Sequence, residues 1–214
     1  MSTVDFSQLL PPSLITELSY EAIFTKRKES FISLYDASEQ QAVRELLQRE
    51  SEPVVKLLQE NAYLEMLYQA KCNADARSLL LAYAEKSDLD HLALTEYGLT
   101  RLVVIPADNT VIPPVEAVYE SDERLRERCI LSFDGMNTAG SANAYRYFTL
   151  SADGRVDGIK VKSDEATPCF LDIVITQVDS ENGAASEELI QIVQTALDPD
   201  TVRPVGDRPT VKSS

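Results

Sequence analysis

The feature that most constrains this fold is a stretch without helix breakers, from Pro53 to Lys86. Proline suits the first turn of a helix, where no backbone N–H donor is needed, and neither glycine nor a second proline follows it here. At a rise of 1.5 Å per residue, a helix of about 34 residues would form a rod roughly 50 Å long. We therefore expect the sequence Ser51-Glu52-Pro53 to open one unusually long helix.

Apolar side chains cover much of the surface of this expected helix. A first stripe consists of Val54, Val55, Leu58, Ala62 and Tyr63, and it is widened by Leu57, Leu64, Met66, Leu67, Tyr68 and residues 79–81. An apolar surface this wide must be covered by other helices. Two interpretations stay open: the helix is the core of an internal three-helix bundle, or partner chains complete the bundle. The residues of the partner-binding hypothesis are Val54, Val55, Leu58, Ala62, Leu64, Met66 and Leu67.

Two shorter helices are expected before the long one. The first covers residues 14–35, which lack glycine and proline, and a Pro-Pro-Ser sequence at residues 11–13 would start it. The second covers residues 38–49. Its apolar face consists of Ala42, Val43, Leu46 and Leu47. Residues 1–88 are therefore predicted to form a helical bundle domain whose helices bind partners or form a trimer.

The chain changes character after this bundle. Residues 89–120 are predicted to hold a connecting helix that ends near Gly98, and then a β-rich linker interrupted by prolines, as is typical of edge strands. Residues 121–214 are predicted to form a small α/β region. Ser121 would cap its first helix, and Gly135 is expected to close that helix as a C-terminal cap.

Strands and helices alternate in this last region. Strands are expected at residues 156–162, 168–178 and 210–212, and a helix capped by Ser186 would lie between the last two. The second strand has apolar side chains on both of its faces, so it is predicted to be central in the sheet and covered. The predicted fold class is α+β: an N-terminal long-helix bundle followed by small α/β domains with helices packed on one face of short mixed sheets.

Composition restricts the classes of partner. The 214 residues carry a formal net charge of −15, and a surface this acidic repels phosphate backbones and anionic lipids. Nucleic acid and membrane are therefore not expected as partners, and no segment approaches the ~20 apolar residues that span a bilayer. Cys72, Cys129 and Cys169 are far apart, and we interpret them as small buried hydrophobic side chains in a reducing compartment.

A glycine-containing stretch at residues 135–156 raises the question of an enzyme site. Gly135 and Gly140 have the spacing of a phosphate-binding loop, but Ser141-Ala142 stands where that motif needs lysine followed by serine or threonine. Ser141 also has no partner that could act as its catalytic base. We interpret the loop as a chain reversal, with Thr138 or Ser141 capping the next helix.

A metal site is also considered, because the one histidine, His91, follows Asp88 and Asp90. Adjacent residues cannot face one ion from a regular helix, so Asp90 and His91 are predicted to form a solvated helix boundary. The sequence thus offers no catalytic residues, no cofactor-binding residues and no metal ligands, and the chain is not expected to be an enzyme or to need a cofactor.

Several ordered segments resemble one protein family. The segment "LDHLALTEYGLTRL" resembles the Leu-Asp-x-Leu and Gly-x-x-Arg pattern of baseplate J-like proteins from contractile phage tails. The segments "SDERLRER", "AGSANAYRYFTLSADGRV" and "ASEELIQIVQTALDPDTVRPVGDRPTV" are similar to later blocks of that family, and "ESEPVVKLLQENAY" is similar to its N-terminal part. Because the blocks keep the family's order, the resemblance is more specific than any one motif.

The resemblance implies a structural role in the baseplate wedge. In that picture a second copy of the chain and a smaller I-type tail protein join the first copy in a heterotrimer, through a bundle of N-terminal helices. These units surround the central hub and spike and contact the sheath-initiator or lysozyme-like baseplate protein. The plate changes shape on host contact and releases sheath contraction. The implied location is the tail baseplate of a virion, after assembly in the cytoplasm of the bacterial host.

Alternatives stay open beside this role. The family pattern implies a further C-terminal domain that would make ring-forming contacts, so this chain is expected to be a shortened member or a fragment. A baseplate protein of a contractile bacteriocin (tailocin) or related injection particle is the nearest alternative, because such particles reuse the same parts without a capsid. A free-standing enzyme is the third hypothesis, motivated by the loop at residues 135–141.

Overall fold

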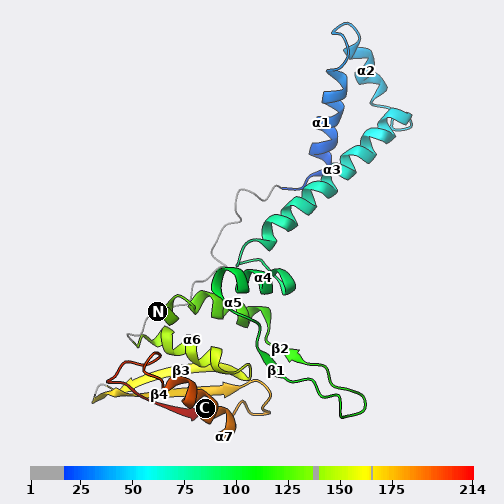
Figure 1. Cartoon of the computed structure of the whole chain (residues 1–214). Helices are drawn as coiled ribbons and strands as arrows, with labels where there is room; N and C mark the ends of the chain where they lie inside the picture. Colours follow the sequence, from blue (N-terminus) through cyan, green and yellow to red (C-terminus); the bar gives the residue numbers. More distant parts are fainter. Residues whose placement is uncertain (1–16, 137–139, 165) are drawn as a thin grey trace. The chain divides into compact units, whose positions relative to one another are not determined.

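The structure is a computed structural model that describes residues 17–136, 140–164 and 166–214. These residues form a mixed α/β protein, with helices along most of the chain and small sheets in its C-terminal half (Figure 1). They divide into two compact units, with Tyr83 the last residue of the first and Ala84 opening the second. Every described strand lies in the second unit.

The first unit contains the helices α1 (Tyr20–Ile32), α2 (Gln40–Leu46) and α3 (Pro53–Ser78). Its buried core consists of Ile32, Leu47, Val55 and Leu58, with Phe24, Phe31, Val43 and Val54 packed against it. Burying these side chains against one another holds the three helices together, because short helices such as α1 and α2, of 13 and 7 residues, are marginal alone.

The N-terminal helices are shorter than the sequence predicts. The side chain of Ser19 caps α1 by accepting a hydrogen bond from the backbone N–H of Ala22 at 3.3 Å. The predicted start at residues 11–13 lies outside the described residues. α1 then ends at Ile32, before residue 35, because the chain turns there to pack α2 back against it.

α3 begins as predicted, with Glu52 at the N-cap and Pro53 in the first turn, but the prediction of one helix reaching Lys86 is wrong. The helix ends at Ser78, and turns replace it. Within these turns the backbone N–H of Tyr83 donates to the carbonyl of Leu80 at 2.8 Å.

The physical reason for this break lies in the second unit, where α5 (Asp122–Leu131) binds the backbone that follows the turns. Arg126 donates from its guanidinium to the carbonyl of Ala84 at 2.7 Å. The backbone N–H of Lys86 donates to the carboxylate of Asp122 at 2.9 Å. A helix running through Ala84 would use these backbone groups internally, so the contacts from α5 favour a new start. That start is α4 (Lys86–Tyr97).

The second unit continues from α4 and α5 into a three-stranded sheet (Figure 1). Its remaining elements are β1 (Val103–Ile105), β2 (Val118–Tyr119), the short 3-10 helix η2 (Asp134–Met136), α6 (Ala142–Ala152), β3 (Val156–Asp164), β4 (Thr167–Gln177), α7 (Glu187–Leu197) and β5 (Arg208–Ser213). β1 and β2 form a separate antiparallel pair.

The main sheet has the strand order β3-β4-β5 and is mixed, as predicted. β3 and β4 pair antiparallel, whereas β4 and β5 pair parallel through the α7 crossover. The predicted central position of β4 is confirmed. Its inward-facing residues pack with α6 and α7 in one core that includes Tyr145, Leu150, Leu171, Ile173, Ile175, Leu189, Val193 and Leu197. One face of the sheet is therefore covered by both helices, and the prediction that β4 is covered holds for that face.

Local capping signals explain most helix starts in this unit. Ser121 and Ser186 cap α5 and α7, as predicted, by accepting from the backbone N–H groups three residues ahead. Gly98 closes α4 in the left-handed conformation, with φ of 67°. Gly135 does not close α5, which contradicts the prediction: the helix ends at Leu131 with Ser132 as its C-cap, and Gly135 lies inside η2. A side chain at Gly135 would collide with the ring of Tyr147, so close approach and not capping explains the glycine there.

The cysteine interpretation is right for one residue of three. Cys129 is buried in α5, and burial raises the pKa of its thiol to about 11. Cys72 and Cys169 are exposed, because they lie on the side of α3 and the end of β4 that no described element covers. Among the described helices, none is long and apolar enough to cross a membrane.

Candidate functional site

Charged side chains converge where α4, α5 and the segment before β1 meet. Arg101, in the segment before β1, contacts three other positions: its guanidinium donates to Asp90 on α4 at 2.7 Å, to Asp122 on α5 at 2.7 Å, and to the carbonyl of Glu120, just before α5, at 2.7 Å. The Arg101 side chain is only 16% exposed. Planar guanidinium groups suit such multiple contacts, so Arg101 acts as a fixed structural link.

A second pair lies deeper in the same junction. One carboxylate oxygen of Glu120 accepts from Arg128 and from the backbone N–H of Leu102, the latter at 3.0 Å. Arg128 also donates to the carbonyl of Thr100 at 3.1 Å. Because Glu120 and Arg128 are both buried, removing either one would leave an uncompensated charge in the protein interior.

The pKa values in this junction follow from these contacts. Burial alone would raise the pKa of Asp122, but the donors Lys86 and Arg101 outweigh burial and hold it below the usual range. Burial likewise opposes the charged form of Arg101, yet its contacts with Asp90 and Asp122 raise its pKa above the usual range. Both groups therefore stay ionised near neutral pH, which suits a structural ion pair and not a proton-transfer site.

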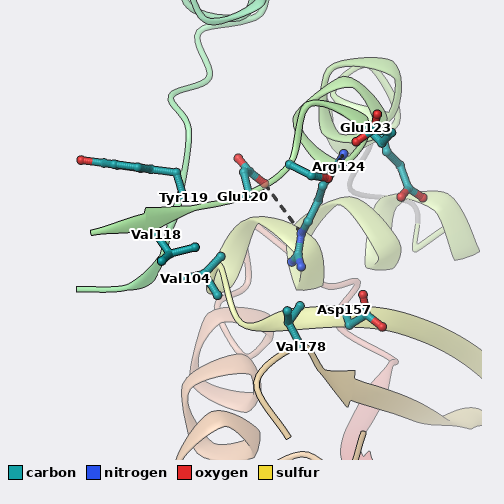
Figure 2. Close-up of a pocket in the computed structure, with 10 residues that line it drawn as sticks. Val104, Val118, Tyr119, Glu120, Glu123, Arg124, Asp157 and Val178 are labelled. Atoms are coloured by element: carbon teal, nitrogen blue, oxygen red, sulfur yellow. Dashed lines mark hydrogen bonds and ion pairs between the residues drawn. The ribbon is translucent and has the colours of Figure 1, made fainter. Parts of the chain in front are cut away.

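A pocket of about 420 Å³ opens beside this junction (Figure 2). The guanidinium of Arg124 points into it between Val104, Val178 and Asp157, as Figure 2 shows. A carboxylate oxygen of Glu120 lies 3.7 Å from Nε of Arg124, which is an ion pair without a hydrogen bond. Burial lowers the pKa of Arg124, and the surrounding carboxylates oppose that effect.

The pocket does not have the features of a catalytic site. The atoms of Glu120 and Arg124 without a hydrogen-bond partner are enclosed by protein, so an occupant of the pocket would not touch them. Its remaining polar lining is mostly acidic, with Glu123, Glu127 and Asp157. We find no nucleophile paired with a base among the residues that line it, and we assign it no substrate.

The loop that first suggested an enzyme instead fixes a turn. Ser141 caps α6, as predicted, by accepting from the backbone N–H of Ala144 at 3.1 Å. Thr138, the other predicted cap, lies outside the described residues. Gly140 has φ of 70° and lies against Asp207. Asp207 in turn accepts from the hydroxyl of Tyr145 at 2.8 Å, and burial together with this carboxylate raises the pKa of Tyr145.

The other candidate residues stay apart. His91 is exposed on α4, and Asp90 beside it is engaged by Arg101. Within residues 17–136, 140–164 and 166–214, no group of three or more His, Cys, Asp or Glu residues could hold a metal ion.

The residues of the partner-binding hypothesis fall on two sides of α3. Val55, Leu58 and Ala62 are buried inside the first unit, and Val54 packs against the same core. Leu64 is 54% exposed and Leu67 is 46% exposed, whereas Met66 is intermediate. The structure therefore leaves Leu64 and Leu67 as the members available to another chain.

Comparison with known proteins connects this geometry to a family. The model of the baseplate J-like N-terminal domain matches residues 50–108, and that of the baseplate J-like central domain matches residues 137–213. The chain belongs to the baseplate J-like family. It is 44% identical over 214 residues to baseplate protein J of Escherichia phage P2, and the match covers 100% of this chain and 70% of the phage P2 protein.

The family matches clarify what the quoted sequence blocks do in this baseplate J-like protein. Asp90 and Arg101 belong to the pattern in "LDHLALTEYGLTRL", and they form the ion pair of the α4–α5 junction. Ser121, at the start of "SDERLRER", is a helix cap. Sequence reasoning missed Glu120 and its buried partner Arg128. The signal that could have found them is a carboxylate just before a helix, followed four and eight residues later by arginines that share one face of that helix.

Proposed function

We propose that this chain is a structural component of the baseplate wedge in a contractile phage tail. In this role it is needed for baseplate assembly and transmits the trigger of sheath contraction. Membership of the baseplate J-like family and the relationship to baseplate protein J of phage P2 support a phage baseplate structural protein. The convergent charges hold elements of the fold together, which fits a role that depends on geometry and not on catalysis.

The observation that carries the proposal is that α3 has two apolar sides. Val55, Leu58 and Ala62 recur at i, i+3 and i+7 and are buried within the first unit. On the other side of the helix, Leu57, Leu64 and Tyr68 recur at i, i+7 and i+11, with Leu67 beside them, and all are exposed. A helix that is already packed on one side can offer its second apolar side to another chain.

The proposed occupant of this second side is a helix of the wedge heterotrimer. It comes from a second copy of the chain or from the I-type tail protein. In this proposal the partner-binding domain consists of residues 1–88 and the α/β region of residues 121–214. Residues 89–120 connect the two. That region would face the central hub and spike and the sheath-initiator or lysozyme-like protein. The complex would assemble in the bacterial cytoplasm before it enters the tail.

In a contractile bacteriocin, the exposed apolar side of α3 would bind a partner helix in the same way. Gene neighbourhood separates the two possibilities, because capsid genes beside this gene indicate a phage and their absence indicates a tailocin.

Co-purification tests the proposal directly. A tagged chain is co-expressed with the I-type protein of the same gene cluster, and the I-type protein recovered on the tag is measured. We expect Leu64→Glu combined with Leu67→Glu to reduce this recovery at least tenfold, because a charge inside an apolar helix contact is desolvated without a partner. Leu34→Glu is the matched control, since Leu34 is 79% exposed in the turn after α1. Undiminished recovery with the double variant would contradict the proposed interface.

A further inference from the structure

Lysines gather on the face of the main sheet that is turned away from α6 and α7. Lys160, Val174 and Lys212 are paired across the three strands. Ile173 and Ile175, on either side of Val174 along β4, point into the core, so Val174 and its cross-strand neighbours occupy the opposite face. We call this surface the basic sheet face and define it by Lys160, Lys162, Asp172, Val174, Thr176 and Lys212.

The charge of this face is opposite to that of the chain. The whole protein has a net charge of −15 and eight lysines, and three of those eight are on this one face. Lys212 forms an ion pair with Asp172 at 2.7 Å. Among the described side chains, no carboxylate pairs with Lys160 or Lys162, and both lysines are exposed. Among the described side chains, Lys160 and Lys162 are thus two cations that a partner could neutralise.

The shape of the face suits an inserted side chain. A hollow of about 370 Å³ lies between Lys160 and Lys162 on one side and Val174 and Thr176 on the other. Gly158, which has no side chain, helps to open it: a Cβ there would come within 2.8 Å of the Thr176 hydroxyl. A short acidic side chain can enter such a hollow with its carboxylate between the two ammonium groups.

The kind of partner follows from charge. The described residues cover only one face of the main sheet, and the basic sheet face is the other. Among anionic partners, nucleic acid and lipid surfaces present extended negative charge that the rest of this acidic chain would repel. A protein can place a local carboxylate cluster on the lysines and keep its other charges away.

We propose that the basic sheet face docks a carboxylate-rich surface of a neighbouring protein subunit in the assembled baseplate, with Asp or Glu side chains placed between Lys160 and Lys162. This inference rests on the proposed function, because it needs the chain to be part of the particle.

Zero-length cross-linking with a carbodiimide tests the chemistry, since this reagent joins an amine to a carboxylate in direct contact. Assembled tail particles and the free chain are treated in parallel, and cross-linked peptides are identified by mass spectrometry. We expect Lys160 or Lys162 to be cross-linked to Asp or Glu of a neighbouring subunit in the particles. We expect no such cross-link in the free chain. Acetylation of the same two lysines should be at least fivefold slower in particles than in the free chain.

Charge variants add a readout in assembly. The double variant Lys160→Glu and Lys162→Glu should enter particles at least tenfold less than the parent chain, while Lys160→Arg with Lys162→Arg should enter normally because charge is kept. The thermal unfolding midpoint of each free variant is compared with that of the parent chain, and an unchanged midpoint shows that folding is intact.

The outcomes separate this inference from the proposed function. Particles that lack the chain altogether would overturn both. Particles that contain the chain, with Lys160 and Lys162 as reactive as in the free protein and without carboxylate cross-links, would overturn this inference alone. Protection that is lost after nuclease treatment would point to nucleic acid and would also overturn it.

Discussion

Asp90 accepts a hydrogen bond from Nε of Arg101 at 2.7 Å, so the two ends of one sequence pattern, eleven residues apart, meet in space. The same guanidinium continues to Asp122, in the next sequence block, at 2.7 Å. Two blocks that are separate in the sequence therefore build one junction between α4 and α5. Their physical role is to hold helices in a fixed relation inside the second unit.

Replacing Arg101 with alanine should destabilise the second unit by about 2–4 kcal/mol, because Asp122 loses a charged donor and the Glu120 carbonyl loses its hydrogen bond. Chemical denaturation followed by circular dichroism measures the change. Lys160→Ala is the control: this exposed side chain has no ion pair among the described residues, so its effect should stay within about 0.5 kcal/mol. An Arg101→Ala variant as stable as the parent would show that the contacts of Arg101 contribute nothing to the stability of the second unit.

The pH dependence of stability should trace to Asp122. Its pKa is lowered in the folded protein, so its contribution is complete above the unfolded value near 3.8 and is lost as pH falls through the lower folded value. Asp122→Asn should therefore be less stable than the parent at pH 7, and the difference should shrink at acidic pH below about 4. Urea unfolding measured between pH 2 and pH 7 checks this, with exposed Asp200→Asn as control. A difference that stays constant over this range would contradict the assignment.

Features set by neighbouring residues could be predicted from the sequence. Pro53 opening α3, the Ser121 and Ser186 caps, and the central apolar strand β4 all depend on local chemistry or alternation, and the structure has them. The break after Ser78 could not be predicted, because no breaker stands there and the cause is a contact from Arg126, 42 residues beyond Ala84.

In the candidate site, too, features set by neighbouring residues could be predicted and features set by distant contacts could not. A helix cap at Thr138 or Ser141 could be predicted from local chemistry, and Ser141 is a cap in the structure. The burial of Glu120 instead depends on Arg128 and on a backbone group near β1. The division of α3 into a buried and an exposed apolar side also could not be read from the helix alone. It depends on which side α1 covers, and the sequence of α3 is apolar on both.

Gly140→Ala should destabilise the second unit by about 2–3 kcal/mol, since φ of 70° disfavours a side chain and the new Cβ would lie 2.6 Å from Asp207. Displacing Asp207 would also weaken its hydrogen bond from Tyr145. Two matched variants separate the causes. Gly183→Ala has the same backbone strain, with φ of 72°, but open space, and Gly206→Ala has neither problem. Thermal unfolding should rank the losses Gly140 first, then Gly183, then Gly206, and equal losses for all three would refute the steric explanation.

Ser141→Ala tests the enzyme hypothesis. Loss of the cap to the Ala144 N–H should cost about 1 kcal/mol, and particle assembly and infectivity should be unchanged. Ser141→Asp, which keeps a capping oxygen, should recover the stability. Infectivity lost in a Ser141→Ala variant that still folds and assembles would count against a purely structural role.

The last prediction concerns the particle. If the chain acts as a wedge component, its removal should stop assembly at a defined point, and no unconverted substrate should accumulate. Cells that make the other tail components without it should contain unattached sheath and tube subunits, or aberrant sheath polymers, because ordered polymerisation needs the plate as its nucleus. Electron microscopy of such lysates measures this directly.

Complementation then connects the defect to α3. The parent chain and the Leu34→Glu control should restore tails, since Leu34 lies outside the exposed apolar side of α3. The Leu64→Glu and Leu67→Glu double variant should fail while remaining folded, because Leu58 and the rest of the internal core are untouched. Ser141→Ala should restore tails fully. Normal-length tails assembled in the complete absence of this chain would refute the function proposed for it.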